Sequence, residues 1–536
     1  MSSSSKSPSQ RISMVNATAP EMPIHHNQGI RITMEPVNYV QRITNFLLRW
    51  GIETHGIAPI KPEARTDTRL YQMFFVWFSA NFNILALSTG SAGPAFFGLG
   101  LRHSLLVIFF ADLVMCAVPA YFAVFGPKLG MRGMVQARYS WGYYAAVIPS
   151  LLNVFSMQGF LIANCIIGGQ VLASISDKLN ATLGIVIIGV LSLIICFCGY
   201  KVVHWFESFS WIPNLIIFPI LLGVGGKHLN PANFVTPDPP TPASVISFIT
   251  FISSSVISWC TMTPDYGVYH NGKASSVRIF LYTYFGFFAA SVKDLKSTSI
   301  STQYSLWCQL PAHMIGAAFA AAASSVPSWK TGFEGGTNLG GLVSAILAPT
   351  GGFGKFLIVV LSLCVTSAGA PTMYTFGTSF MSIAPIFAKV PRYVYVLISE
   401  AILIPVGIIG ATRFYLVLVN ILSVIGYWSS AFAGIVFTEH FLFRKGRFSN
   451  YDLDDYDHPR GLPLGLASLF AFLAAVGIIV PSMSQAWYTG PIAKAGTGDI
   501  GVFTGFFVAV LFYGVLRSVE KRYWDSRQQG VIALKS

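Results

Sequence analysis

Two interrupted apolar segments decide how this chain folds. Residues 77–94 read WFSANFNILALSTGSAGP, and residues 253–264 read SSSVISWCTMTP. Each lies in a run long enough to cross a bilayer, yet small polar residues, Gly or Pro interrupt it. Lipid cannot satisfy the backbone groups that such residues free, so we expect broken helices that line a cavity or pack against protein. The alternative is ordinary close packing of helices through small residues.

The composition places both segments in an all-α polytopic membrane protein surrounded by lipid. Of the 536 residues, 53% are hydrophobic and only 10% are charged, whereas soluble domains carry about 25% charged residues. Twelve apolar runs approach bilayer length, and we expect helices because each must pair its own backbone groups. The runs cover residues 71–97, 104–125, 143–172, 183–199, 209–225, 244–262, 279–323 (interrupted), 353–383, 393–411, 414–437, 462–481 and 500–517.

The two interrupted runs are the first and the sixth, five helices apart. An inverted five-plus-five repeat gives this spacing, with the substrate between the two halves at mid-membrane. The sequence therefore predicts a transporter architecture as well as a membrane protein.

The positive charge indicates orientation. With the N-terminus in the cytoplasm, 25 of the 34 Lys and Arg residues fall on inside segments and 7 on outside loops, as the positive-inside rule requires. We therefore predict that both ends are cytoplasmic. The predicted organisation is a mostly disordered tail (1–70), a transporter domain (71–517) and a C-terminal tail (518–536). No basic groove with interleaved aromatic residues appears, so the net charge of +13 does not indicate a nucleic-acid partner.

A polar stretch at residues 291–305 interrupts the seventh run. It contains Lys293, Asp294 and Lys296, and each charge at a helix centre costs about 2.5–3.5 kcal/mol on insertion scales. Deleting the stretch leaves one continuous apolar helix. It is therefore either a real polar insertion or the product of a retained intron.

Signatures of enzymes and cofactors are absent from the sequence. It contains no Gly-rich phosphate loop ending in Lys-Ser/Thr, no paired-His zinc motif and no Gly-x-Ser-x-Gly elbow. The seven cysteines lie within apolar runs or at their edges, which argues against a disulfide framework. We expect no enzymatic activity, no metal and no cofactor.

The third and sixth runs carry residues suited to a flat ligand. Phe160 and Asn164 are four residues apart and so share one helix face. Trp259, in the interrupted sixth run, offers a second ring. Two rings and an amide suit a small planar heterocycle, which the rings stack on and the amide reads at its edge. Each residue also has a structural interpretation, since Asn often bonds a neighbouring helix and Trp often lies at the membrane interface.

Acidic residues inside the runs are candidates for proton coupling. Glu207 lies one turn from His204 and either shares a proton with it or reaches water near the cytoplasmic end. Asp112 is interpreted as structural, and the role of Glu400 stays open.

The chain resembles the fungal purine–cytosine permeases of the nucleobase–cation symporter-one family. The resemblance covers about residues 50–520. The segments that carry it are Gly51–Glu53 (GIE), Arg65–Arg69 (RTDTR), Trp77–Asn83 (WFSANFN), Gly126–Gly130 (GPKLG), Gln136–Ser140 (QARYS), Asn164–Gln170 (NCIIGGQ) and Tyr269–His270.

This resemblance implies a LeuT-type five-plus-five inverted repeat plus two C-terminal helices, with a proton as co-substrate and a plasma-membrane location. It places a nucleobase-like substrate between spans one, three, six and eight. By position, Phe160 and Asn164 match the aromatic and the amide of the third span, Trp259 matches the stacking residue of the sixth, and Ser88 matches a polar contact on the first.

The eighth span departs from the family pattern. Relatives that transport purines and cytosine tend to show Asn-x-x-Pro-Asn, whereas this chain reads AGAPT at residues 368–372. Pro371 is kept, but Thr372 replaces a ligand-reading amide. The alternatives are a transporter of pyridoxine-type vitamins and a transport-deficient paralogue or receptor. Thr366 and Ser367 fall where sodium-coupled relatives bind their ion, although these hydroxyls also suit capping of their own helix.

Overall fold

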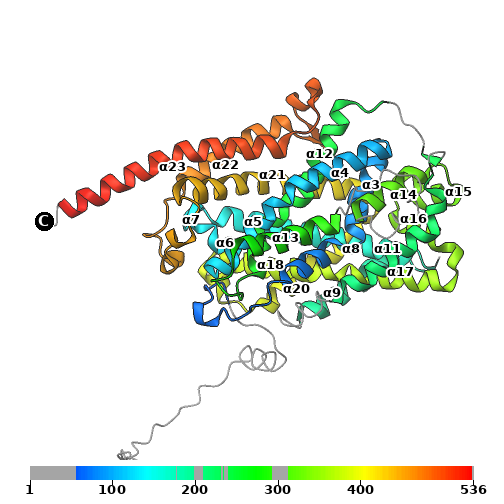
Figure 1. Cartoon of the computed structure of the whole chain (residues 1–536), viewed down its shortest axis with the longest axis horizontal. Helices are drawn as coiled ribbons and strands as arrows, with labels where there is room; N and C mark the ends of the chain where they lie inside the picture. Colours follow the sequence, from blue (N-terminus) through cyan, green and yellow to red (C-terminus); the bar gives the residue numbers. More distant parts are fainter. Residues whose placement is uncertain are drawn as a thin grey trace, which may run out of the picture. The chain divides into compact units, whose positions relative to one another are not determined.

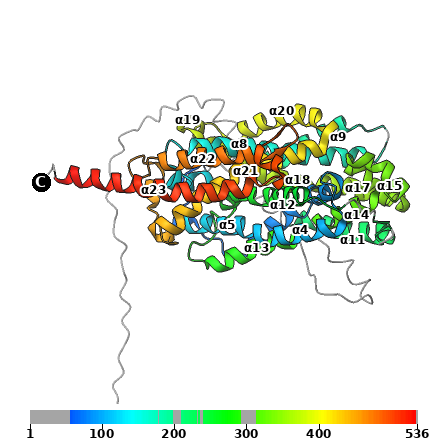
Figure 2. The same ribbon diagram turned by 90° about the horizontal axis from the view of Figure 1, so that it is seen from above.

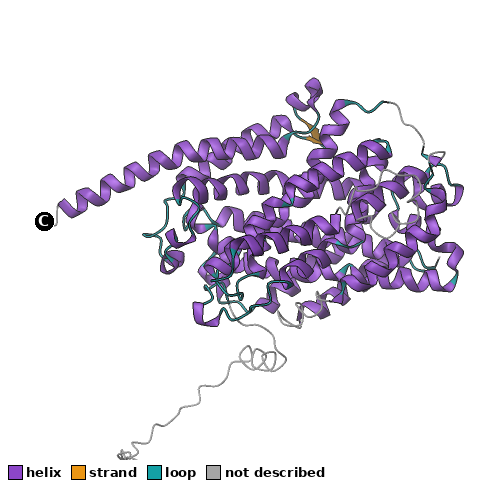
Figure 3. Ribbon diagram, in the orientation of Figure 1, coloured by secondary structure: helices purple, strands orange, loops and turns teal. Residues whose placement is uncertain are grey.

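Helices make up nearly all of the described chain. The computed structural model describes residues 56–176, 178–197, 209–230, 233–234, 239–291 and 312–533, all within one compact unit, Leu47–Ser536. Within these ranges the strands are a single antiparallel pair of two-residue segments, β1 (Ser484–Gln485) and β2 (Tyr488–Thr489). Figure 3 shows this pair in orange among purple helices. The predicted all-α class is confirmed.

The helices follow the apolar runs in order along the chain (Figure 1). The first half contains α2 (Gln72–Asn81), α3 (Ile84–Ala95), α4 (Leu101–Met115), α5 (Ala117–Leu129), α6 (Gly133–Gln136), α7 (Arg138–Trp141), α8 (Val147–Ala173), α9 (Ala181–Phe197), α11 (Trp211–Gly225) and α12 (Pro242–Ile257). The second half contains α13 (Ser276–Ser291), α14 (Ala312–Ala323), α15 (Pro327–Phe333), α16 (Leu339–Leu347), α17 (Gly352–Cys364), α18 (Thr366–Ile383), α19 (Pro385–Ala388), α20 (Arg392–Gly410), α21 (Phe414–Thr438), α22 (Leu466–Ser482) and α23 (Gly501–Ala533).

Length and composition make the chain a multi-pass membrane protein. Six helical segments of the described chain are long and apolar enough to cross a bilayer, and the bent pair α2 and α3 makes a seventh. One of the six, Arg392–Phe443, contains two of the predicted runs, with the 3₁₀ turn η10 (Ala411–Arg413) between them. Other apolar helices, such as α14 and α22, have 12 and 17 residues. The total of twelve spans and the repeat stay predictions.

The first span is broken, as predicted. Helices α2 and α3 meet at a bend of 51°, with Phe82 and Asn83 between them outside helical geometry. The Asn83 side chain accepts hydrogen bonds from the Leu85 and Ala86 N–H groups, at 2.8 and 3.1 Å, and so starts α3. Its amide also donates to the Ala80 carbonyl near the end of α2, at 2.6 Å. One asparagine thus satisfies backbone groups on both sides of the break.

The sixth span changes from α-helix to 3₁₀-helix inside the protein. Helix α12 ends at Ile257, and two 3₁₀ turns follow it, η4 (Ser258–Thr261) and η5 (Thr263–Tyr266). Every residue of both turns is buried. This irregular backbone therefore lies against protein, which is the condition for its survival at membrane depth.

The seventh run divides into two helices that follow the two halves of the first span. Helix α13 packs along α2, and α14 packs along α3. The close approach of α14 and α3 requires glycine. A Cβ atom at Gly90 would lie 1.8 Å from the His313 carbonyl oxygen, and one at Gly316 would lie 1.9 Å from that of Leu87. The charged stretch predicted to interrupt this run lies, from residue 292 onward, outside the described residues.

The segment before the first span is packed onto the helices. Ile60 and Arg65 are buried, and the Arg65 guanidinium donates to the carbonyls of Ile60 (2.7 Å) and Pro127 (3.3 Å). Residues 56–70, which were assigned to the N-terminal tail, thus include contacts with the end of α5. At the other end of the chain, α21, α22 and α23 lie side by side in both views (Figures 1 and 2).

Candidate functional site

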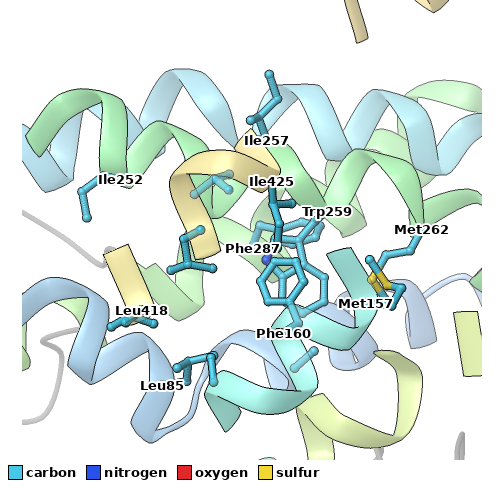
Figure 4. Packing of buried hydrophobic residues seen from close by; sticks show 14 of the residues in the cluster. Leu85, Met157, Phe160, Ile252, Ile257, Trp259, Met262, Phe287, Leu418 and Ile425 are labelled. Carbon is cyan, nitrogen blue, oxygen red and sulfur yellow. The ribbon is translucent and has the colours of Figure 1, made fainter. Parts of the chain in front are cut away.

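Two of the predicted site residues place their rings against one another. Phe160 comes from the middle of α8, and Trp259 comes from η4, just after α12 ends. Their ring centroids are 5.3 Å apart, and the ring planes are inclined by 34°. Both side chains are buried. Figure 4 shows the pair where α8 meets the irregular part of the sixth span.

Trp77 and Phe287 extend this pair into a cluster of four rings, which we call the aromatic cluster (Trp77, Phe160, Trp259 and Phe287). Trp77 lies 5.8 Å from Trp259 and 5.0 Å from Phe287, and Trp259 lies 6.1 Å from Phe287, all between centroids. The sequence prediction missed Trp77 and Phe287. The available signal was the position of Trp77 in α2, just before the break.

The rings of the aromatic cluster pack directly against one another. Aromatic pairs prefer centroid separations of about 4.5–7 Å, so a ring inserted between two others would hold them roughly 9 Å apart. Phe160 and Trp259 are too close for this. A planar ligand sandwiched between them therefore requires the two rings to part.

Asn164 presents an unused acceptor. Its Nδ2 donates to the Phe160 carbonyl one turn earlier, at 2.9 Å. Its Oδ1 is buried and receives no hydrogen bond from the described residues. A buried polar atom left without a partner costs about 1–3 kcal/mol. A ligand N–H group or a water molecule would remove this cost.

Ser88 and Thr372 direct their hydroxyl protons into their own helices. Ser88 donates to the Ile84 carbonyl at 3.1 Å, and Thr372 donates to that of Ala368 at 2.7 Å. Both side chains are fully buried. Each hydroxyl oxygen keeps lone pairs that can accept a hydrogen bond. Helix α8 packs against both α3 and α18, so the helices that carry the predicted contacts are neighbours.

Pro371 and the two candidate ion-binding hydroxyls also lie on α18. Pro371 is buried inside the helix, and because it lacks an N–H group it cannot donate to the carbonyl four residues earlier. Ser367 contacts the Ser79 carbonyl of α2 with a Oγ–O distance of 3.4 Å. Thr366 donates within its own turn to Leu363, at 2.7 Å. Ser367 thus links α18 to α2 near the break, whereas the Thr366 hydroxyl satisfies a backbone carbonyl one turn earlier.

The remaining predicted coupling residue, Glu207, and its neighbour His204 lie outside the described residues. Of the other intramembrane acids, Asp112 pairs with His313, with 2.9 Å between Oδ2 and Nδ1. Glu400 is buried on α20, and neither carboxylate oxygen has a hydrogen-bond partner among the described residues.

A hydrogen bond closes the protein on the α3 side of the break. The Ser91 and Tyr415 hydroxyls lie 2.5 Å apart and join α3 to the start of α21. The Phe333 ring lies edge-on to Tyr415, at a centroid separation of 6.3 Å. A cavity of about 310 Å³ lies nearby, at the end of α3, lined by residues of α3, α14 and α15 that include Ala95, Ala320 and Phe333.

A polar cluster closes the protein on the other side, where η5 meets α18. Asp265 Oδ1 accepts from the Gly133 N–H at 2.7 Å, and Oδ2 accepts from the Thr378 hydroxyl at 3.0 Å. The Tyr374 ring lies between two guanidinium groups, 4.8 Å from that of Arg132 and 3.7 Å from that of Arg392. We interpret the Ser91–Tyr415 bond and this polar cluster as two closures of the substrate path, as expected of an occluded transporter.

Comparison with known proteins places these features in a family context. The family described as permeases for cytosine/purines, uracil, thiamine and allantoin matches residues 59–461. The purine-cytosine permease FcyB of Emericella nidulans is 31% identical over 489 residues, which cover 90% of this chain and 92% of that protein. The vitamin B6 transporter TPN1 of Saccharomyces cerevisiae is 27% identical over 533 residues, which cover 90% and 88%.

Solved structures share the fold. Mhp1, a nucleobase-cation-symport-1 family transporter in a closed conformation with bromovinylhydantoin bound, matches with a TM-score of 0.62 and 17% identity, over 87% of this chain and 96% of that one. Its inward-facing conformation gives a TM-score of 0.61, also at 17% identity, over 88% and 96%. This similarity confirms the LeuT-type fold class.

Proposed function

Since this chain belongs to the family of permeases for cytosine/purines, uracil, thiamine and allantoin, we propose that it imports a small planar nitrogen heterocycle, coupled to protons, across the plasma membrane. The protein is a membrane transporter rather than an enzyme. Import proceeds by alternating access, in which one helix bundle rocks against the other around a central site.

One observation carries the proposed substrate class. Asn164 holds a buried, unused acceptor on the same helix face as Phe160, whose ring meets Trp259. The Ser88 and Thr372 hydroxyls donate within their helices, so they too offer acceptors. Rings together with acceptors suit a flat molecule with N–H groups along its edge. The proposed site consists of Ser88, Phe160, Asn164, Trp259, Pro371 and Thr372.

The coupling ion is proposed from candidate residues that the sequence indicates. Glu207 is the candidate proton acceptor from the sequence, and Thr366 and Ser367 are candidate cation contacts. Thr366 donates to its own helix and Ser367 contacts the Ser79 carbonyl of α2, and the family resemblance favours a proton over sodium as the coupling ion. The distribution of Lys and Arg supports two cytoplasmic ends.

Pyridoxine-type vitamins are the second candidate substrates. Thr372 replaces an amide at the position where purine and cytosine transporters tend to carry one, and a hydroxyl cannot offer the same donor–acceptor pair. A vitamin B6 transporter is among the relatives. For this reason a pyridoxine-type vitamin is the alternative substrate that we name.

The test is uptake of labelled cytosine, adenine, hypoxanthine and pyridoxine in a yeast strain that lacks its own transporters. We expect saturable uptake of at least one compound, faster at acidic external pH, and its loss in Asn164→Ala. Asn153→Ala is the matched control, because Asn153 lies on the same helix and bonds Ser379 away from the proposed site. This control should keep the substrate affinity.

Two outcomes would contradict the proposal. Absence of pH-dependent uptake of all four compounds removes the nucleobase-type function, and binding without transport in proteoliposomes identifies a receptor-like paralogue. Normal transport by Asn164→Ala removes that residue from the site.

A further inference from the structure

A buried aspartate–histidine pair joins α4 to α14, outside the proposed substrate site. Asp112 of α4 and His313 of α14 are separated by 2.9 Å between Oδ2 and Nδ1. Asp112 is 0% and His313 5% exposed. The second carboxylate oxygen, Oδ1, is buried and has no hydrogen-bond partner among the described residues. The pair is thus a buried polar site with one unused acceptor.

The pair lies deep in the membrane. The span that contains Asp112 covers Leu101–Leu129, and Asp112 lies about 17 Å from its first residue at 1.5 Å per residue. Intramembrane ionisable residues are costly, and their usual roles are ion pathways and proton relays.

Few other charges face this pair. Cys116, one turn further along α4, and Tyr284 of α13 are close enough to interact with Asp112 electrostatically. The elements α3, α11 and α12, which pack on α4 or α14, carry no titratable side chain. Lys128 of the adjoining α5 and Lys330 of α15 lie 16 and 17 positions along the chain from the pair. Among the described residues, no Lys or Arg forms an ion pair with Asp112.

Protonation of the pair is positioned to affect the first span. The His313 carbonyl lies where a Cβ atom at Gly90 would be, and Gly316, one turn later, meets the Leu87 carbonyl in the same way. Ser88 lies between these two contacts on α3. Because the two backbones touch, α14 cannot shift without moving α3.

From this geometry we propose that Asp112 and His313 together bind the transported proton. Without it, a carboxylate and a neutral imidazole carry a net charge of −1. With it, the pair is neutral, as an ion pair or as two uncharged groups. The proton reaches the pair from the side of the membrane to which the protein is open, and it leaves to the other side. Proton binding and release therefore need no further reactant. This inference rests on the proposed function, because it names the coupling site of that transporter.

Charge balance explains how the site couples to movement. A buried pair with a net charge is costly in a low-dielectric interior, whereas a neutral hydrogen-bonded pair is not. Conformations that enclose the pair, such as this one, therefore favour the protonated form. Occlusion then requires the proton, and release of the proton favours reopening.

The experiment compares proton movement with exchange in proteoliposomes. His313→Gln and Asp112→Asn each keep a side chain that can hydrogen-bond its partner but cannot titrate. We expect both variants to keep substrate counterflow, which needs no net proton movement, and to lose uptake driven by a pH gradient and substrate-induced proton influx. Tyr284→Phe is the control, because it removes a neighbouring titratable group and should keep both activities.

Rescue and spectroscopy separate this inference from the proposed function. The swapped pair, Asp112→His with His313→Asp, should restore part of the proton influx even if the single variants fold poorly. Infrared difference spectra between acidic and neutral pH of the purified wild-type protein should show a carboxyl or imidazole band that both Asp112→Asn and His313→Gln lack, whether or not a substrate has been found. Undiminished proton influx in both single variants, its loss in Glu207→Gln alone, or difference spectra unchanged in both variants would overturn the assignment.

Discussion

At the scale of single residues, we propose that the eighth span sets the substrate preference. Ala368 and Thr372 replace the two amides of the family pattern, and the Thr372 hydroxyl donates to Ala368 itself. We predict that Ala368→Asn combined with Thr372→Asn raises cytosine uptake relative to pyridoxine by roughly fivefold for each restored hydrogen bond of about 1 kcal/mol. Competitive uptake measures this ratio. Thr372→Ser, which keeps the hydroxyl, should leave the ratio unchanged, and an unchanged ratio in the double variant would contradict the assignment.

A buried carboxyl outside the spans makes a prediction about pH. Asp499 precedes α23, and burial raises its pKa, although hydrogen bonds from the Tyr427 hydroxyl and the Ser484 and Gly501 N–H groups lower it in part. A carboxyl whose folded-state pKa is raised contributes stability that is complete below its unfolded pKa of about 3.9 and is lost as pH rises through the folded pKa. Thermal unfolding at acidic to neutral pH should therefore show a smaller loss on raising the pH in Asp499→Asn than in the wild type.

Asp67 is the matched control with the opposite sign. Burial raises its pKa, but hydrogen bonds from Arg69 and the nearby His270 outweigh burial, so its net shift is downward. Its contribution is present above the unfolded pKa and is lost as pH falls through the folded one. Asp67→Asn should thus reduce the acid-induced loss of stability. Parallel changes in the two variants would contradict these assignments.

The sequence indicated candidate site residues but not the side chains that they contact. Helical spacing places Phe160 and Asn164 on one face, and the break indicated Trp259. The sequence gives no information on which helix faces from distant parts of the chain contact one another. Trp77 joins the aromatic cluster from α2, and His313 meets Asp112 across 201 positions of the chain. These pairings depend on how the helices pack, which neither hydropathy nor local spacing determines.

At the scale of elements, the break in the first span depends on Asn83. Its side chain caps α3 and donates to the end of α2, and loss of an N-cap costs about 0.5–2 kcal/mol. We predict that Asn83→Ala lowers the melting temperature of the purified protein and reduces uptake. Asn81→Ala, in which the lost bond runs only to the Trp77 carbonyl, should have a smaller effect. Equal effects would show that the bend does not depend on this cap.

The packing of the two helices in the seventh run supports the interpretation that they form one span. Helix α13 (Ser276–Ser291) lies along α2 and α14 (Ala312–Ala323) lies along α3, so together they follow the whole first span. We predict that a chain lacking residues 291–305 reaches the cell surface at least as well as the full chain, as microscopy of a fluorescent fusion would show. Sequencing of the transcript decides the origin of the stretch, because a spliced message that still encodes Lys293 and Lys296 excludes a retained intron.

Predictions for elements succeeded where composition forces the local structure. Small polar residues and Gly in the first run, and Ser with Pro264 in the sixth, marked breaks that the structure contains. The Gly-rich residues 332–341 include the end of α15 and the start of α16. The Asn338 side chain caps α16 by accepting from the Gly341 N–H at 2.8 Å.

At the scale of the whole molecule, we propose that two sets of contacts close the substrate path. One is the Ser91–Tyr415 hydrogen bond between α3 and α21. The other joins Asp265 of η5 to Thr378 of α18 and to Gly133. In the proposed orientation, with both ends of the chain in the cytoplasm, the second faces the cytoplasm. Alternating access requires that these closures open one at a time, so weakening one should shift the population of conformations toward that side.

Thr378→Val tests this expectation at the cytoplasmic closure. The substitution removes a hydroxyl that donates to a buried carboxylate, and hydrogen bonds to charged groups contribute about 1.5–3 kcal/mol. A shift of that size toward the inward-open state lowers the fraction of protein able to bind substrate from outside, so the apparent KM for uptake should rise, by up to about tenfold for a shift of about 1.5 kcal/mol. Hydrogen exchange in α6 and α7, which follow Arg132, should become faster.

Ser382→Ala is the matched control, because its hydroxyl donates only to the Thr378 carbonyl of the same helix. If KM and exchange are the same in both variants, the Asp265–Thr378 bond is structural, and the cytoplasmic closure depends instead on the guanidinium groups that enclose Tyr374.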